Sequence, residues 1–244
     1  TNYGMDLEGR SLLPHLLLEL DSLKGEFWLR MLYTYPSRIS RELLGVMRDS
    51  VHICPYLDLP LQHSEDRVLA AMGRRTTRKE ILQTLDLIRE NLPEAALRTT
   101  FILGYPGETE EEFEKLREFL QMVRFDWVGF FPFYQEEGAK AAKMKPQVPQ
   151  AIREERAAEL STVQQGISRE KNQALIGSRL TVMVEKRSES SIWTGRSYRE
   201  APEIDGVIEL KAPENSSWSP GDFLVAEVIQ AEAYKVVAAD ASDE

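Results

Sequence analysis

Two apolar stretches, residues 53–59 and 97–103, restrict the fold of this chain more than any other feature. Each is followed at once by polar, Pro and Gly residues, PLQHS at 60–64 and GYPGET at 104–109, and then by a helical pattern. Strands of a parallel α/β barrel are mostly apolar, and they deliver polar groups from their carboxyl ends to one shared rim. The pattern therefore predicts parallel strands whose ends gather around one site.

Two more predicted strands, at residues 27–33 and 127–133, extend this alternation. Between the strands, Thr77 with Glu80 and Thr109 with Glu112 have the spacing of capping boxes, which mark helix starts. Repeated strand–helix units predict an α/β fold with a parallel sheet or barrel. Few such units are visible, and the chain opens on a polar tail and a helix. We therefore expect a fragment that lacks the N-terminal part of its barrel.

The pattern changes after the Pro-containing segment 146–149. A long helix is predicted at about residues 150–174, followed by short strands at 179–186, 191–197, 207–210, 223–231 and 234–239. Short strands separated by turn residues predict a small all-β barrel of the oligomer-binding type. We expect two domains, residues 1–175 and residues 176–244.

The charge of the chain bears on its partners. The net charge is −10, and residues 176–244 carry 7 Lys and Arg against 13 Asp and Glu. Nucleic-acid binders normally have a basic footprint, whereas an acidic surface attracts basic proteins. The composition thus favours a basic protein partner, with solubility as the alternative reason for the acidity. No apolar run is long enough to cross a bilayer and no signal-peptide pattern is visible, so we expect a cytoplasmic protein with no membrane partner.

Metal and disulfide chemistry is limited by the cysteine count. Cys54 is the single cysteine, which excludes an intrachain disulfide and a cysteine-only metal site. The three histidines are scattered, with no close pair at ligand spacing. The sequence predicts no metal ligands in this chain.

The predicted rims supply the candidate site residues, and each has a structural alternative. Gly104 allows backbone to approach a ligand closely, or it serves an ordinary turn. His63 is a possible proton-transfer group, or a structural histidine. Arg98 lies in an apolar strand, where it holds either a ligand carboxylate or an internal carboxylate. Adjacent Glu136 and Glu137 bind a cationic group, or are simply solvated.

Several motifs together resemble the methylthiotransferase branch of the radical S-adenosylmethionine enzymes. CPYLDLPLQH at 54–63, followed by MGRR at 72–75, is similar to the RimO group of that branch. RTT at 98–100, GYPGETE at 104–110 and EEG at 136–138 match as well. GRSYREAPEIDG at 195–206 resembles part of a TRAM domain. Ala139 departs from the pattern, which more often has Thr after Glu-Glu-Gly.

The resemblance implies a partial radical SAM barrel of the TIM type followed by a TRAM barrel. It implies methylthiolation of the β-carbon of an aspartate in a small-subunit ribosomal protein, with a deoxyadenosyl radical removing the hydrogen. It further implies S-adenosyl-L-methionine and two 4Fe-4S clusters as cofactors. The cysteines that hold those clusters in the family have no counterpart here, so we expect this chain alone to be inactive. The electron donor is not indicated.

The same resemblance assigns roles to residues of the rims. No catalytic residue is assigned, and the ribosomal protein is expected to bind through the acidic domain 176–244. The sister group, which modifies tRNA, usually has His-Leu-Pro-x-Gln-Ser-Gly where this chain has Asp58-Leu-Pro-Leu-Gln-His-Ser64, so tRNA is the less favoured substrate. A non-catalytic partner-binding module is the other alternative. The expected S-adenosylmethionine contacts are Gln62, Arg98, Ile102, Gly104, Glu108 and Phe133, and the expected substrate contacts are His63, Glu136 and Glu137.

Overall fold

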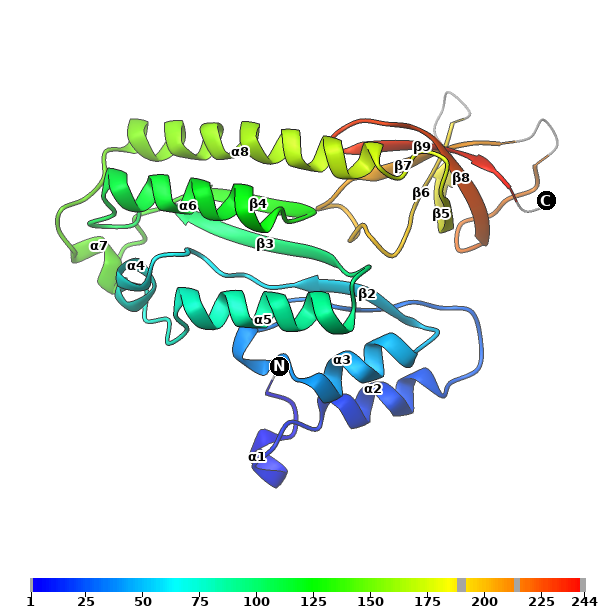
Figure 1. Cartoon of the computed structure of the whole chain (residues 1–244), viewed down its shortest axis with the longest axis horizontal. Coiled ribbons are helices and arrows are strands. Elements are labelled where there is room, and N and C mark those ends of the chain that lie inside the picture. Colours follow the sequence, from blue (N-terminus) through cyan, green and yellow to red (C-terminus); the bar gives the residue numbers. More distant parts are fainter. Residues whose placement is uncertain (1, 188–191, 213–215, 242–244) are drawn as a thin grey trace. The chain divides into compact units, whose positions relative to one another are not determined.

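A computed structural model describes residues 2–187, 192–212 and 216–241 (Figure 1). The chain divides into two compact units. One comprises the residues up to Leu23 and Met31–Gln164, and the other comprises Lys24–Arg30 and the residues from Gln165 onward. Among the described residues, no helix combines the length and the apolar character needed to cross a membrane.

A four-stranded sheet has the strand order β1-β2-β3-β4, and its strands β2, β3 and β4 lie wholly in the first unit. The strands are β1 (Leu29–Met31), β2 (Ile53–Asp58), β3 (Ala96–Leu103) and β4 (Trp127–Pro132). β3 pairs in parallel with β2, where Asp58 lies opposite Arg98, and with β4, where Ile102 lies opposite Phe131. The parallel sheet predicted from the sequence is thus confirmed, although the first strand is shorter than residues 27–33.

Helices connect the strands in the expected order (Figure 1). Both predicted capping boxes are present, and they begin α5 at Thr77 and α6 at Thr109. The elements that precede or join the strands are α1 (Met5–Glu8), α2 (Leu13–Asp21), the 3-10 helix η1 (Pro36–Arg38), α3 (Arg41–Asp49), α4 (Asp66–Ala71), α5 (Arg78–Asn91), α6 (Glu110–Val123), α7 (Lys140–Lys143) and the long α8 (Gln150–Gln173).

β3 has two unlike faces. Leu97, Thr99, Phe101 and Leu103 are buried, whereas the residues between them are only partly buried. The Phe101 ring meets Phe119 of α6 edge-on, with ring centroids 6.4 Å apart. One face of the strand therefore carries the core against the helices, and the other face, with Arg98, Thr100 and Ile102, belongs to the open side of the sheet.

The second unit contains a closed barrel with strand order β5-β6-β7-β9-β8. Its strands are β5 (Arg179–Arg187), β6 (Trp193–Arg196), β7 (Val207–Lys211), β8 (Phe223–Ala231) and β9 (Lys235–Asp240). Alternate residues such as Val182, Val184 and Val228 fill its core. This confirms the predicted small barrel; Ser191, the first residue of the strand predicted at 191–197, lies outside the described residues.

The motif at 195–206 has a structural explanation within this unit. A Cβ at Gly195 would lie 2.4 Å from the carbonyl oxygen of Met183, so only glycine fits between β5 and β6. The buried carboxylate of Glu200 accepts hydrogen bonds from the backbone N–H and the hydroxyl of Ser197, at 2.9 and 2.7 Å. Asp205 accepts another from the N–H of Ala201. These carboxylates hold the loop between β6 and β7.

Candidate functional site

The ends of β2 and β4 are fastened to β3 by backbone hydrogen bonds. The N–H of Gln62 donates to Thr100 O at 2.8 Å, and the N–H of Ile102 donates to Gln62 O at 2.9 Å. The N–H of Phe133 donates to Leu103 O at 2.8 Å, one residue before Gly104. The structure therefore brings Gln62, Gly104 and Phe133 to one edge of the sheet.

A small cavity of about 190 Å³ lies at the Gln62 end of this edge, away from Gly104 and Phe133. Gln62 reaches it with a left-handed backbone, φ 73°, and its side-chain amide lies 3.5 Å from the Thr100 hydroxyl. Such a backbone is uncommon for a residue other than glycine, and it is held here by the two hydrogen bonds to β3. The residues that line the cavity are Tyr33, Thr34, Tyr35, Pro60, Gln62 and Arg74.

Glu108 lies in a buried network behind the edge. Its carboxylate accepts hydrogen bonds from the N–H of Gly104 at 3.0 Å and from Arg156 Nη1 at 2.6 Å. His63, fully buried, accepts a hydrogen bond from the N–H of Glu65 at Nδ1 and places Nε2 3.4 Å from Glu108. Glu108 thus holds the turn after β3, and His63 is buried close to it, although its Nε2 makes no hydrogen bond within the described residues.

Arg98 has an internal carboxylate partner. Its Nη1 donates to Asp58 Oδ1 at 2.9 Å, and Asp58 Oδ2 accepts from the N–H of Tyr33 at 3.0 Å. The parallel register of β2 and β3 places these two residues side by side. Of the two alternatives for Arg98, the structure contains the internal ion pair.

Gly104 and Phe133 are both packed against Arg153 of α8. A Cβ at Gly104, φ 69°, would lie 2.4 Å from Arg153 Cγ. Arg153 also donates to Phe133 O at 2.7 Å, and its guanidinium lies 5.2 Å from the centre of the Phe133 ring. Gly104 is required for close packing of protein on protein at this turn, rather than by an open space for a ligand.

The loop after β4 contrasts with this packing. Glu136 and Glu137 are exposed, and so is Tyr134, at 80%.

The sequence did not identify Arg153 or Arg156, because α8 carries them many residues after the strands that they hold. Only the folded chain brings these two buried arginines to the turn after β3.

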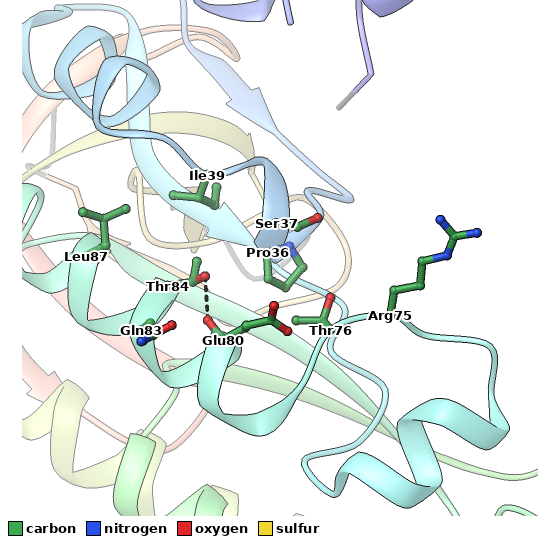
Figure 2. Close-up of a pocket in the computed structure, with 9 residues that line it drawn as sticks. All are labelled: Pro36, Ser37, Ile39, Arg75, Thr76, Glu80, Gln83, Thr84 and Leu87. Atoms are coloured by element: carbon green, nitrogen blue, oxygen red, sulfur yellow. Dashed lines mark hydrogen bonds between the residues drawn. The ribbon is translucent and has the colours of Figure 1, made fainter. Parts of the chain in front are cut away.

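A wider depression lies between η1 and α5 (Figure 2). Its volume is about 360 Å³, and Glu80, Thr84 and Leu87 of α5 form one wall. The Thr84 hydroxyl donates to Glu80 O at 2.9 Å, drawn as a dashed line in Figure 2. The Glu80 carboxylate accepts from the N–H of Thr77 at 2.7 Å in the capping box, and these bonds lower its pKa. This carboxylate therefore serves the helix start.

Comparison with known proteins gives a consistent result for both units. Residues 9–120 match the Radical SAM superfamily and residues 176–239 match the TRAM domain. The chain thus contains a radical SAM domain followed by a TRAM domain. Ribosomal protein uS12 methylthiotransferase RimO of Carboxydothermus hydrogenoformans is 45% identical over 87% of this chain and 49% of its own length. The RimO of Lachnoclostridium phytofermentans is 41% identical over 97% of the chain and 54% of its own length.

The chain spans about half the length of the curated relatives it matches. Radical SAM proteins use S-adenosylmethionine and an iron–sulfur cluster. The cavity at the edge of the sheet fits part of S-adenosylmethionine. The polar residues that line it are Gln62 with an amide, Thr34 and Tyr35 with hydroxyls, and Arg74 with a guanidinium. At about 190 Å³ it is smaller than the pockets of roughly 300–1,000 Å³ that enclose most ligands.

The residues present do not fit an iron–sulfur cluster. Such clusters are held by several cysteine thiolates, and Cys54 is alone and buried in β2. Within residues 2–187, 192–212 and 216–241, no group of three or more His, Cys, Asp or Glu side chains is placed to hold a metal ion.

Proposed function

We propose that this chain forms part of a radical SAM methylthiotransferase that modifies the β-carbon of an aspartate in ribosomal protein uS12. Two relatives named as uS12 methylthiotransferases are 45% and 46% identical to it over 213 and 211 residues. The proposal is supported most directly by the backbone hydrogen bonds to β3. These bonds bring Gln62, Ile102 and Phe133 together at one edge of the sheet.

We assign the nucleoside part of S-adenosylmethionine to this edge. When bound in the whole enzyme, the cofactor supplies the deoxyadenosyl radical. The chain's own contribution is to orient the nucleoside through the Gln62 amide, with Ile102 and Phe133 beside it at the same edge. Gly104 supports this edge through its hydrogen bond to Glu108. Glu108 and Arg98 act behind the edge, since their charges are already paired with Arg156 and Asp58. Glu136 and Glu137 remain proposed contacts for a basic substrate.

We further propose that two 4Fe-4S clusters act in the whole enzyme, with ligands outside this chain. Incubation of the chain with iron and sulfide should then give no cluster absorbance and no cleavage of S-adenosylmethionine. The chain without added iron is the baseline. Substantial iron binding with a cluster spectrum would overturn this part of the proposal.

The TRAM barrel is the proposed contact for uS12. We propose that the partial radical SAM barrel, with its linking helix, ends at residue 175 and that the TRAM domain begins at residue 176. The match to the TRAM domain starts at the same residue. The unit carries an excess of acidic residues, and a basic ribosomal protein would be attracted to it. Such a substrate places the enzyme in the cytoplasm. The double substitution Glu203→Gln with Glu227→Gln should weaken uS12 binding and reduce its salt dependence. The control Glu118→Gln, on α6, should change neither the affinity nor the salt dependence.

The nucleoside assignment is tested by titrating S-adenosylhomocysteine into the chain and following ligand signals by NMR. We expect weak saturable binding, because no cluster is present to hold the methionine end. Gln62→Gly keeps the positive φ allowed and removes the amide, so affinity should fall about three- to tenfold, the value of one hydrogen bond. Gln121→Ala, on the exposed surface of α6, is the matched control. Equal affinities for the two variants would contradict the assignment.

A further inference from the structure

Three neighbouring depressions in the first unit share lining residues, and we refer to them together as the groove. The cavity at Gln62 shares Tyr35 and Arg74 with a neighbouring depression of about 530 Å³. That depression in turn shares Ser37, Arg75 and Thr76 with the one between η1 and α5 (Figure 2). The groove therefore leads from the edge of the sheet, past η1 and the segment between α4 and α5, to the surface of α5.

The groove is basic, although the chain as a whole is acidic. Arg38, Arg74 and Arg75 line it, and no carboxylate of the described residues lies within ion-pair distance of their guanidinium groups. Glu80 lines the far end, but its carboxylate is engaged in the capping box. Three unpaired guanidinium groups in a chain of net charge −10 create a local site for anions.

Aromatic rings accompany these charges. The Arg74 guanidinium lies 5.2 Å from the centre of the Tyr35 ring, and Tyr35 is half exposed. Tyr33, 72% exposed, stands at the end of the groove that meets Gln62. Arginines that neutralise phosphates, together with exposed aromatic rings on which unstacked bases lie, are the chemistry of single-stranded nucleic-acid binding. An acidic peptide would use the arginines alone.

We propose that this groove, defined by Arg38, Arg74, Arg75 and Tyr35, binds the phosphate groups of a single-stranded RNA segment. The proposal deepens the proposed function and rests on it for the source of the RNA. Ribosomal proteins are RNA-binding proteins, so RNA is a natural companion of the proposed substrate, and the groove begins at the cofactor edge. The acidic TRAM unit and the basic groove then recognise the protein and the RNA of one substrate.

The test uses a fluorescein-labelled 15-nucleotide oligouridylate and fluorescence anisotropy. Three phosphate contacts at about 0.7 released counterions each predict a salt slope of about 2, or about twentyfold weaker binding at 200 mM than at 50 mM KCl. Arg74→Ala with Arg75→Ala should weaken binding at least tenfold and lower the slope by about 1.4. Arg38→Ala alone, on η1, should lower it by about 0.7.

Arg48→Ala is the matched control, because this exposed guanidinium of α3 is paired with Asp49 and lies outside the groove. Its affinity should change less than twofold. Absence of saturable binding, equal loss in the control, or equal affinity for a hexaglutamate peptide would overturn the proposal, the last by reassigning the groove to acidic peptides. The assay contains neither cofactor nor uS12, so its failure is distinguishable from failure of the proposed function.

Discussion

The turns that follow β3 and β4 belong to neighbouring strands of one sheet, yet they differ in almost every physical property. After β3, Glu108 is buried, with Gly104 and Arg156 donating to its carboxylate. After β4, Glu136 and Glu137 are exposed. Strand order alone therefore places a residue at the rim, whereas burial and pairing decide whether its side chain can meet a ligand. The turn after β3 stabilises the edge of the sheet from inside the protein, whereas the loop after β4 exposes its carboxylates to solvent.

Removal of the Glu108 carboxylate is the strongest test of this contrast. Glu108→Ala leaves the buried N–H of Gly104 and the Nη1 group of Arg156 without an acceptor, although Arg156 keeps Glu110 as a second partner at 2.7 Å. The free energy of unfolding should therefore fall by about 3–4 kcal/mol. Glu136→Ala is the control in the β4 loop and should change it by less than about 0.5 kcal/mol. Urea denaturation measures both. Similar losses in the two variants would remove the distinction between the turns.

Gly104 and Gly138 offer a matched pair of glycines with positive φ. Alanine at Gly138, φ 85°, meets nothing within 4 Å and should cost about 1 kcal/mol of backbone strain. Alanine at Gly104 adds a clash with Arg153, and its total cost should reach about 2–3 kcal/mol. Thermal denaturation compares the two variants. A smaller cost at Gly104 would show that Arg153 moves aside easily.

A pH titration addresses the ion pair that braces the β3 turn. Arg67 donates to Gly107 O at 2.6 Å and to the carboxylate of Glu112 at the start of α6. Burial alone would raise the pKa of Glu112, but the bonds from Arg67 and Thr109 outweigh it and lower the pKa from 4.5 to about 2. A lowered pKa stabilises the fold above pH 4.5, and that stability is lost as the pH falls towards 2.

The expected loss is about 1–2 kcal/mol, since Arg67 is half exposed and water screens the pair. Unfolding free energies measured between pH 6 and pH 3 should show this slope in the unmodified chain. Glu112→Gln should be less stable at pH 6, with a flatter pH dependence. An identical slope in both proteins would exclude this carboxylate as the cause.

Local patterns explain which features the sequence predicted. Each capping box, at Thr77 and at Thr109, needs only four consecutive residues. The parallel strands are predicted from short apolar runs that alternate with helical segments. The pairing of Arg98 with Asp58 depends on register, which neither run specifies alone. Arg153 and Arg156 escaped prediction because their partners lie on other elements. The rim was predictable, but the network that supports it was not.

The smallest effect is expected in the β4 loop. Glu136→Gln with Glu137→Gln should leave the unfolding free energy within about 0.5 kcal/mol of the unmodified chain, because both side chains are solvated. If the loop contacts a basic substrate, the same variant should bind uS12 more weakly at low salt. The same double substitution therefore separates a surface role from a supporting role. A clear loss of stability would show that these carboxylates stabilise the fold instead.

Gln62, Ile102 and Phe133 gather at one edge of the sheet, and we propose that this edge accepts an adenosyl nucleoside. Backbone amide shifts recorded by NMR during titration with S-adenosylhomocysteine test it most directly. We expect saturable shifts at these three residues, with none at Gly195 or Val228 in the TRAM barrel. Shifts confined to the barrel, or their absence at the sheet edge at saturating ligand, would contradict it.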